Sequence, residues 1–426
     1  MNDWKEYAIG QLFCSHVPGE WGSPPTGHAG DMLILRSTNF TNSGKLDFSN
    51  VVVRHIPLSK RKKCRLEIGD LLLEKSGGGP EQPVGRVVLF DDKSGANYGF
   101  ANFLERLIVS PGFDPKFITY LLLNGYVNGL TLRYEQQTTG IRNFKLGDYF
   151  KEKIKVAPPP EQRKIVAIMT TADNLIDRTE AVIAKYQAYK QGLMHDLFTR
   201  GIDARGQLRP SQIDSPNLYE QSALGWIPKG WHVQSVNQLF INRREHGRPG
   251  LPVMAVTGVD GLVERSSVDR RVESNLTPYG HALVERGDIV YNMMRMWQGV
   301  LGYAKYDCLV SPAYIILKPT DKIRTVFAAF LFKFKSTIAK FRQYSQGVVD
   351  DRLRLYFRDL VRIQLAVPKS VDEQEQIEIR IAQLNASIES EQRLLKKYVD
   401  AKAGLMQDLL TEKVRVKVGE GGEVGV

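Results

Sequence analysis

The chain has 426 residues and carries 58 Lys and Arg against 47 Asp and Glu, which leaves a formal net charge of +11. This length suits two or three domains with sizeable cores. The positive balance favours a polyanionic partner such as nucleic acid, and a merely basic soluble protein is the alternative.

The cysteines and the first residues bear on the compartment. Cys14, Cys64 and Cys308 lie far apart and lack metal-ligand spacing, which disfavours a disulfide scaffold and favours a reducing environment. Residues 1–10 carry charges where a signal peptide needs an apolar run, and no apolar stretch approaches the length of a membrane span. We therefore expect a soluble cytoplasmic protein.

Residues 1–157 predict a mixed domain built mostly of short strands. Apolar or β-branched runs separated by Gly, Pro, Asn and Asp are typical of strands. Such runs occur at 32–36, 51–54, 71–74, 84–90 and 104–109. Pro115 begins a predicted helix that extends to about Asn124.

Two polar loops of this domain carry groups suited to DNA. The run Ser76-Gly77-Gly78-Gly79-Pro80 would let the backbone approach a phosphate, but no Gly-Lys-Ser/Thr follows it, and a plain flexible turn is the alternative. The run 136–143 joins amide, hydroxyl and guanidinium groups, which bond base edges and phosphates; its alternative is a solvated loop. The candidate DNA contacts of the domain are Arg36, Lys75, Arg133, Gln137, Thr138, Arg142 and Asn143.

Residues 158–200 predict one long helix that begins near Pro160 and ends at Gly201. Apolar residues recur alternately four and three positions apart, which is the seam of a coiled coil. The seam residues are Ile165, Met169, Ile176, Ile183, Tyr186 and Leu193. Forty residues would make a helix of roughly 60 Å.

The chain then repeats itself after a polar linker at 201–224. A second domain at 225–367 restarts the pattern, since Gly287-Asp288-Ile289 echoes Gly69-Asp70-Leu71. A second long helix at 368–412 repeats 161–199 as 373–411, 212 positions later and without a gap. Its seam residues are Ile377, Ile381, Leu384, Ile388, Leu395, Tyr398 and Leu405. The duplication predicts a pseudo-two-fold internal repeat, in which the framework recurs and the loops do not. A flexible tail is expected at 413–426.

The second domain has its own polar clusters. Residues 292–299 place Arg, Gln and Asn beside a tryptophan that we expect to be exposed, which suits base reading; a strand whose Met and Trp fill the core is the alternative. Residues 344–354 precede the second helix as 137–143 precede the first. The candidate DNA contacts are Asn292, Arg295, Trp297, Gln298, Gln346, Arg352 and Arg354.

The two helices have matching registers and matching polar seam positions. Thr179 corresponds to Glu391, and Lys190 corresponds to Lys402. Shared polar positions favour helices that meet each other, or that meet one partner twice. Two ordinary amphipathic helices in separate cores are the alternative, and the pattern alone does not give their orientation.

These features together resemble the specificity (S) subunit of Type I restriction–modification enzymes. The resemblance lies in repeated helices that open with Pro and Glu-Gln and close with Gly-Leu-Met-x-Asp-Leu, and it covers the chain to about Thr411. It also lies in the runs 224–231, 287–299 and 310–314, and in Gly69-Asp70, Ser76-Gly77 and Val84-Gly85-Arg86. The Gly-rich end at 419–426 matches nothing in that pattern.

The resemblance implies an α+β fold with two mixed α/β target-recognition domains, separated by two long helices that form an antiparallel coiled coil. Each domain would read one half of a bipartite, asymmetric DNA site in which an adenine is methylated at N6. The helices would act as spacer and docking surface for two modification (methyltransferase) subunits, and restriction subunits can join them in defence against phage. S-adenosylmethionine, ATP and Mg²⁺ are expected on those partners, with no cofactor or metal on this chain.

We do not expect this chain to be an enzyme. Adenine methyltransferases hold the flipped base with Asn/Asp-Pro-Pro-Tyr/Phe, and the runs 311–314 and 275–279 each lack one proline, so we interpret both as turns. Asp350-Asp351 is interpreted as a solvated turn, and the seven histidines form no metal motif. The alternative function is a scaffold whose duplicated modules organise partners without reading DNA.

Overall fold

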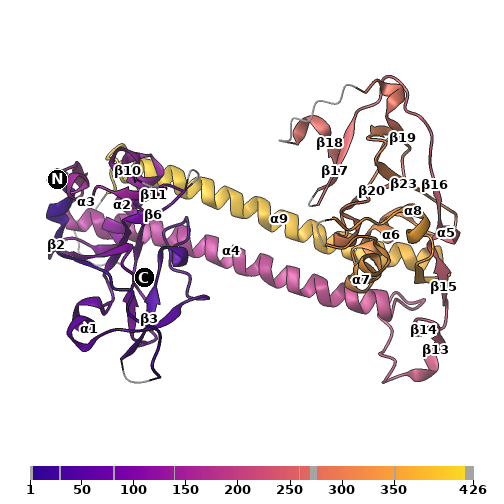
Figure 1. The fold of residues 1–426 in the computed structure, drawn as a ribbon, viewed down its shortest axis with the longest axis horizontal. Coiled ribbons are helices and arrows are strands. Elements are labelled where there is room, and N and C mark those ends of the chain that lie inside the picture. Colours follow the sequence, from indigo (N-terminus) through magenta and orange to yellow (C-terminus); the bar gives the residue numbers. More distant parts are fainter. Residues whose placement is uncertain are drawn as a thin grey trace. The chain divides into compact units, whose positions relative to one another are not determined.

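The structure is a computed structural model, and it describes residues 3–27, 30–79, 82–138, 140–258, 260–268, 276–349 and 352–417 (Figure 1). Two compact units make up the chain: residues 1–180 with 393–426 form unit 1, and residues 181–392 form unit 2. Each unit combines one mixed domain with a part of each long helix, α4 (Pro159–Thr199) and α9 (Val371–Leu409). In the part of the chain that the structure describes, no helix could span a membrane.

Unit 1 is centred on a four-stranded antiparallel sheet in the order β2-β9-β5-β7. Its strands are β2 (Phe13–Pro18), β9 (Leu104–Val109), β5 (Leu71–Glu74) and β7 (Val87–Leu89). All four residues of β5 are buried, because apolar neighbours cover both faces of this central strand. A second sheet, β4-β3-β8, joins β4 (Val52–His55), β3 (Asp31–Leu35) and β8 (Tyr98–Phe100). The strands predicted from the sequence are therefore confirmed.

The remaining elements of unit 1 frame these sheets. Strand β1 (Lys5–Ala8) pairs with β12 (Lys153–Val156), just before α4. The helices are α1 (Leu58–Cys64), α2 (Pro115–Val127) and α3 (Leu146–Tyr149). Helix α2 begins where predicted, because Asp114 caps its first turn by accepting from the N–H groups of Lys116 and Phe117.

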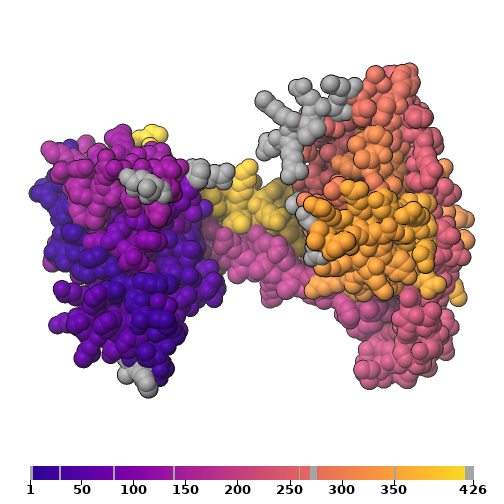
Figure 2. Space-filling view, viewed as in Figure 1, coloured from indigo at the N-terminus to yellow at the C-terminus, as the bar shows by residue number. Residues whose placement is uncertain are grey.

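Unit 2 repeats this plan with the sheet β16-β23-β20-β21. Its strands are β16 (Phe240–Asn242), β23 (Tyr314–Pro319), β20 (Ile289–Asn292) and β21 (Leu301–Tyr303). Separately, β15 (Trp231–Ser235) pairs with β24 (Gln364–Pro368), as β1 pairs with β12 in unit 1. Further hairpins and pairs are β13 (Tyr219–Ser222) with β14 (Gly225–Pro228), β17 (Met254–Thr257) with β18 (Gly261–Glu264), and β19 (Ala282–Val284) with β22 (Cys308–Val310). The helices are α5 (Val236–Leu239), α6 (Thr325–Phe332), α7 (Lys335–Tyr344) and α8 (Phe357–Leu360). Figure 2 shows one face of the molecule in a space-filling view, with the same view and colours along the sequence as Figure 1.

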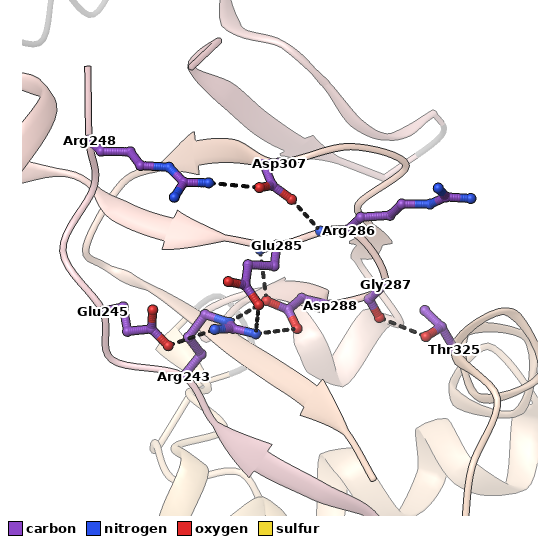
Figure 3. Close-up of polar contacts among 9 residues, drawn as sticks. All are labelled: Arg243, Glu245, Arg248, Glu285, Arg286, Gly287, Asp288, Asp307 and Thr325. Atoms are coloured by element: carbon purple, nitrogen blue, oxygen red, sulfur yellow. Dashed lines mark hydrogen bonds and ion pairs between the residues drawn. The ribbon is translucent and has the colours of Figure 1, made fainter. Parts of the chain in front are cut away.

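The repeated Gly-Asp pair makes the same turn in both units. Gly69 and Gly287 have φ of 98° and 94°, which glycine adopts without strain. The next residue forms a buried ion pair: Asp70 Oδ2 lies 2.7 Å from Arg106 Nε, and Asp288 Oδ2 lies 2.6 Å from Arg243 Nε. Figure 3 shows the second cluster, in which Glu245 and Glu285 also contact the guanidinium. The Gly-Asp pair thus has a structural role in both units. The arginine lies in β9 in unit 1 and directly after β16 in unit 2.

The glutamine that opens each long helix ties that helix to its own domain. Gln162 Oε1 accepts from the N–H of Asp114 at 2.8 Å, immediately before α2. Gln374 Oε1 accepts from the N–H of Arg324 at 2.9 Å, immediately before α6. Helices α2 and α6 are therefore equivalent, and position 114 corresponds to position 324.

The long helices run antiparallel within each unit. In unit 1, Ile165 near the start of α4 shares a core with Met406 near the end of α9. In unit 2, Leu197 near the end of α4 shares a core with Ile377 near the start of α9. The predicted pairing of the two helices is thus confirmed, and the antiparallel orientation is the one that the resemblance implies. Burial is greatest at the seam residues Ile165, Met169, Ile176, Ile183, Ile377, Ile381, Leu384 and Ile388, while Tyr186, Leu193, Leu395, Tyr398 and Leu405 are partly buried.

The segments after each long helix carry ordered contacts. The predicted linker contains β13, and the bridge between Ile202 and Leu208 folds its first part back on itself. In the predicted tail, Arg415 forms an ion pair with Glu161. The end of the tail, 418–426, lies outside the described residues.

Candidate nucleic-acid interface

In unit 1 the two polar loops lie side by side in one small sheet. Strands β10 (Glu135–Thr138) and β11 (Ile141–Phe144) form a hairpin, and β11 pairs with β6 (Ser76–Gly77). The hydroxyl of Ser76 donates to Asn143 Oδ1 at 2.9 Å. Ser76 and Gly77 of the glycine-rich run therefore lie in one small sheet with the described residues of the amide-rich run, although the sequence presents two separate loops. Pro80 lies outside the described residues.

The candidate side chains of unit 1 divide into exposed and engaged groups. Gln137 and Arg133 are exposed, although Arg133 Nη1 lies 3.9 Å from Glu152. Arg142 is engaged with Glu135 at 2.5 Å, Lys75 with Glu105 at 2.9 Å, and Arg36 with the carbonyl of Asn50 at 3.0 Å. The side chain of Thr138, and Thr139 entirely, lie outside the described residues.

In unit 2 the turn that follows β20 holds its polar side chains by internal hydrogen bonds. Asn292 Oδ1 accepts from the N–H of Met294 at 2.9 Å, and Arg295 Nη1 donates to Gln298 Oε1 at 3.1 Å. Arg295 and Gln298 remain exposed. The turn continues into a short 3-10 helix at Met296–Gln298. Of the three methionines of the cluster, Met296 fills the core, whereas Met294 is exposed.

Trp297 does not form the exposed aromatic surface that the sequence led us to expect. Its side chain is half-buried, and its indole N–H donates to the carbonyl of Met294 at 3.0 Å. The guanidinium of Arg342, from α7, lies 5.5 Å from the ring centroid. The expectation that Trp297 is exposed was wrong, because Arg342 of α7 lies over the ring. Helix α7 is distant in sequence, so no local pattern indicated this contact. Trp297 orders the turn, while its neighbours Arg295 and Gln298 face solvent.

The segment 346–355 of unit 2 is hydrogen-bonded to this turn, as the β10–β11 hairpin of unit 1 is hydrogen-bonded to the residue after β5. Gln346 and Arg354 exchange backbone hydrogen bonds of 2.9 Å, and the N–H of Leu355 donates to the carbonyl of Met293 at 2.9 Å. In unit 1 the N–H of Phe144 donates to the carbonyl of Lys75 at the same distance. In both units, therefore, the segment before the long helix is bonded to the segment after the central strand.

The other candidates of this segment are placed as follows. Arg352 and Arg354 are exposed. The Gln346 amide is engaged, because its Nε2 donates to Asp359 at 2.9 Å and its Oε1 accepts from Arg358 at 3.3 Å. Asp350 and Asp351 lie outside the described residues.

A hollow of about 610 Å³ lies beside the turn in unit 2. Its polar lining includes Asn292, Arg295, Gln298, Thr257, Arg265 and Tyr314. Arg265 and Tyr314 were not predicted as contacts from the sequence. Tyr314 belongs to the Ser-Pro-Ala-Tyr run, where the N–H of Tyr314 donates to the carbonyl of Ser311 at 3.0 Å, so this run is a turn as predicted. The similar run that begins at Asn275 lies partly outside the described residues.

A basic helix in unit 1 was also missed by the sequence analysis. Helix α1 has the sequence LSKRKKC and ends in Cys64, its buried residue. Lys62 and Lys63 are exposed, whereas Lys60 is engaged with Glu20 at 2.5 Å. The run of basic residues was a signal that could have been used, because exposed lysines on one short helix are suited to phosphate contacts. Among the described residues, no group of three or more His, Cys, Asp or Glu could hold a metal ion.

Comparisons with known proteins agree with this architecture. Residues 1–185 match the family described as Type I restriction modification DNA specificity domain. The type I restriction enzyme MjaVIII specificity subunit of Methanocaldococcus jannaschii is 25% identical over 308 residues, which cover 67% of this chain and 68% of that protein. A chain described as a type I restriction enzyme MjaX specificity subunit, from the same organism, is 23% identical over 402 residues, covering 90% and 87%.

A solved structure shares the fold. The S subunit of a Type I restriction–modification system from M. genitalium superimposes with a TM-score of 0.54 at 16% identity, over 96% of each chain. The match spans both mixed domains and both long helices. The family model covers residues 1–185, and this superposition shows that the chain has the fold of that S subunit.

Proposed function

We propose that the chain is the DNA-recognition subunit of a Type I restriction–modification complex, and that each mixed domain reads one half of a bipartite, asymmetric site. The observation that carries this proposal is the bond shared by both units, from Phe144 to Lys75 and from Leu355 to Met293. It holds a polar surface at the same place on each domain while the side chains differ. One framework with two different surfaces is what two unlike half-sites require.

The exposed groups at these surfaces have the chemistry of base readers. Arginine pairs with the O6 and N7 of guanine, and glutamine pairs with the N6 and N7 of adenine. Arg295 and Gln298 in unit 2 and Gln137 in unit 1 are exposed at these positions. Exposed cations such as Lys62, Lys63 and Arg352 would bind phosphates, which adds affinity without sequence preference.

The long helices are proposed to act as spacer and as docking surface for two modification subunits. Both helices carry exposed apolar residues that are suited to cover by another protein. These residues are Leu175, Leu394 and Val399 in unit 1, and Val182, Tyr189 and Ile379 in unit 2. S-adenosylmethionine, and ATP with Mg²⁺ where restriction subunits join, would be bound by the partners, and catalysis would belong to them.

A methylation map tests this proposal. The chain is expressed with its modification subunit in a host that lacks DNA methylation, and modified adenines are located by long-read sequencing. We expect one bipartite motif with an undefined gap. Arg295→Ala should change only one of its two halves. No new methylation, with the modification subunit shown to be active through another S chain, would favour the scaffold alternative.

Salt dependence separates the two functions independently. A DNA reader releases counterions when its cations contact phosphates, so its affinity falls steeply as salt concentration rises. We expect the purified chain to show that fall on duplex DNA. A scaffold would bind DNA weakly, and its affinity would not depend on the sequence of the duplex.

A further inference from the structure

The long helices carry a lysine at equivalent positions, Lys402 in α9 and Lys190 in α4, but among the described residues only Lys402 has an ion-pair partner. In unit 1, Lys402 Nζ forms an ion pair with Asp173 Oδ1 at 2.6 Å. The hydroxyl of Tyr120, from α2, donates to the other oxygen of Asp173. Lys402 and Asp173 are both buried. Unit 1 therefore neutralises its buried cation with its own carboxylate.

Unit 2 lacks both of these groups. The equivalent of Asp173 is Asn385, because the helices repeat at an interval of 212. The equivalence of α2 and α6 places Phe330 where unit 1 has Tyr120, so the hydroxyl is also lost. By the same count, Lys333 stands where unit 1 has Leu123. Unit 2 has thus lost a carboxylate and gained a second cation.

An open pocket of about 830 Å³ lies at these positions, between α4, α6 and α9 of unit 2. Its polar lining consists of Lys190, Lys333, Asn385, Gln187, Gln191, Glu389 and Gln392. Within the described part of the chain, neither lysine ammonium has a hydrogen bond or an ion pair. Burial lowers the pKa of Lys190, and nearby Lys333 lowers it further against the opposing effect of Glu389. Burial of part of the side chain also lowers the pKa of Lys333, although the residue is exposed to solvent.

The remaining acidic group does not replace the missing one. Glu389 is exposed, and it corresponds to Asp177 of unit 1, which is engaged there by Lys45. Two cations therefore face one exposed carboxylate in the pocket. Its amides, from Gln187, Gln191 and Asn385, are able to donate hydrogen bonds to an incoming oxygen.

We propose that the pocket of unit 2 receives the carboxylate of an Asp or Glu side chain from a partner protein, in the place that Asp173 fills in unit 1. The internal repeat identifies the chemistry, because it shows which group completes this lysine site when the chain supplies it. The identity of the partner rests on the proposed function, in which modification subunits dock on the long helices. It follows that the two docking surfaces are not equivalent. Binding at the unit 2 surface depends on an ion pair with the partner.

The test measures the affinity of the full chain for its modification subunit in the wild type and in three variants. Lys190→Met and Lys333→Met together remove the cations, and Asn385→Asp supplies the carboxylate internally. Lys185→Met, at an exposed position of α4, is the control. We expect the double variant and Asn385→Asp each to weaken binding at the unit 2 surface about tenfold or more. Lys185→Met should leave the affinity unchanged.

The other outcomes are distinguishable. Unchanged affinity in both pocket variants, with normal binding by the wild type, would overturn this inference alone. Weaker DNA binding by the free chain, with unchanged subunit affinity, would identify a phosphate as the occupant and would also overturn it. Failure of the wild type to bind the modification subunit would overturn the proposed function and this inference together.

Discussion

The indole N–H of Trp231 donates to Glu373 Oε1 at 2.9 Å, although 142 positions separate the two residues. Arg209, from the segment after α4, holds the same carboxylate at 2.5 Å and 2.9 Å. In unit 1, Trp4 donates to Glu161 at 3.2 Å, and Arg415 from the segment after α9 pairs with it. The glutamate in the first turn of each long helix thus contacts both the mixed domain of its own unit and the segment that follows the other long helix.

Glu373→Gln is expected to destabilise unit 2. The substitution keeps the size of the side chain but leaves the half-buried Arg209 guanidinium without its counter-charge. Hydrogen bonds to charged groups contribute about 1.5–3 kcal/mol, so we expect a loss of about 2 kcal/mol in the free energy of unfolding. Urea denaturation monitored by tryptophan fluorescence measures it. Glu180→Gln, an exposed helical position, is the control, and equal losses in both variants would contradict the interpretation.

Lys190→Met and Lys402→Met are expected to change stability in opposite directions. Among the described residues Lys190 forms no ion pair, so its removal should raise the Tm of the free chain. Lys402 is paired with Asp173, so its removal leaves a buried carboxylate without its counter-charge and should lower the Tm. Calorimetry on the free chain checks both variants. A lower Tm for Lys190→Met would show that this lysine is already neutralised within unit 2.

The lowered pKa of Lys190 also predicts that the stability of the free chain depends on pH. Because the pKa of Lys190 is lowered in the folded chain, the unfolded chain binds more protons between that lowered value and the ordinary lysine pKa of about 10.4. The free energy of unfolding should therefore gain a contribution that rises with pH through this window. We expect the difference in stability between Lys190→Met and the wild type to shrink as pH rises. A difference that is independent of pH would contradict the lowered pKa.

Arg295→Ala is expected to relax one base position. An arginine that reads guanine contributes about 1–3 kcal/mol of discrimination. Binding measured on duplexes that differ at single positions should lose preference at one of them. Arg286→Ala, an exposed arginine outside the hollow, is the matched control. A loss of the same size on every duplex would make Arg295 a phosphate contact instead.

Lys62→Gln with Lys63→Gln should weaken binding to all duplexes equally. Each phosphate contact contributes about 0.9 to the slope of log K against log salt concentration. If both lysines contact phosphates, the slope should fall by about 2. Titration at several salt concentrations measures it. An unchanged slope would remove α1 from the interface.

Patterns that are local in the chain were predicted correctly from the sequence. The heptad seam of α4 and α9, the buried strand β5 and the start of α2 each depend on residues close together in sequence. A helix or a strand shows its buried face through its own period, so composition and spacing suffice. The duplication is equally visible, because aligned residues recur at a fixed interval. The sequence by itself thus determined the elements, the repeat and the regions that carry polar surfaces.

Only the tertiary structure decided how these regions meet. The pairing of Ser76 with Asn143, the cover of Trp297 by Arg342, and the different surroundings of Lys190 and Lys402 all join residues distant in sequence. No local period records such contacts, because a side chain is buried or neutralised by whatever the fold brings to it. Two lysines at equivalent repeat positions therefore look identical in sequence, and their different charge environments arise from the helices packed beside them.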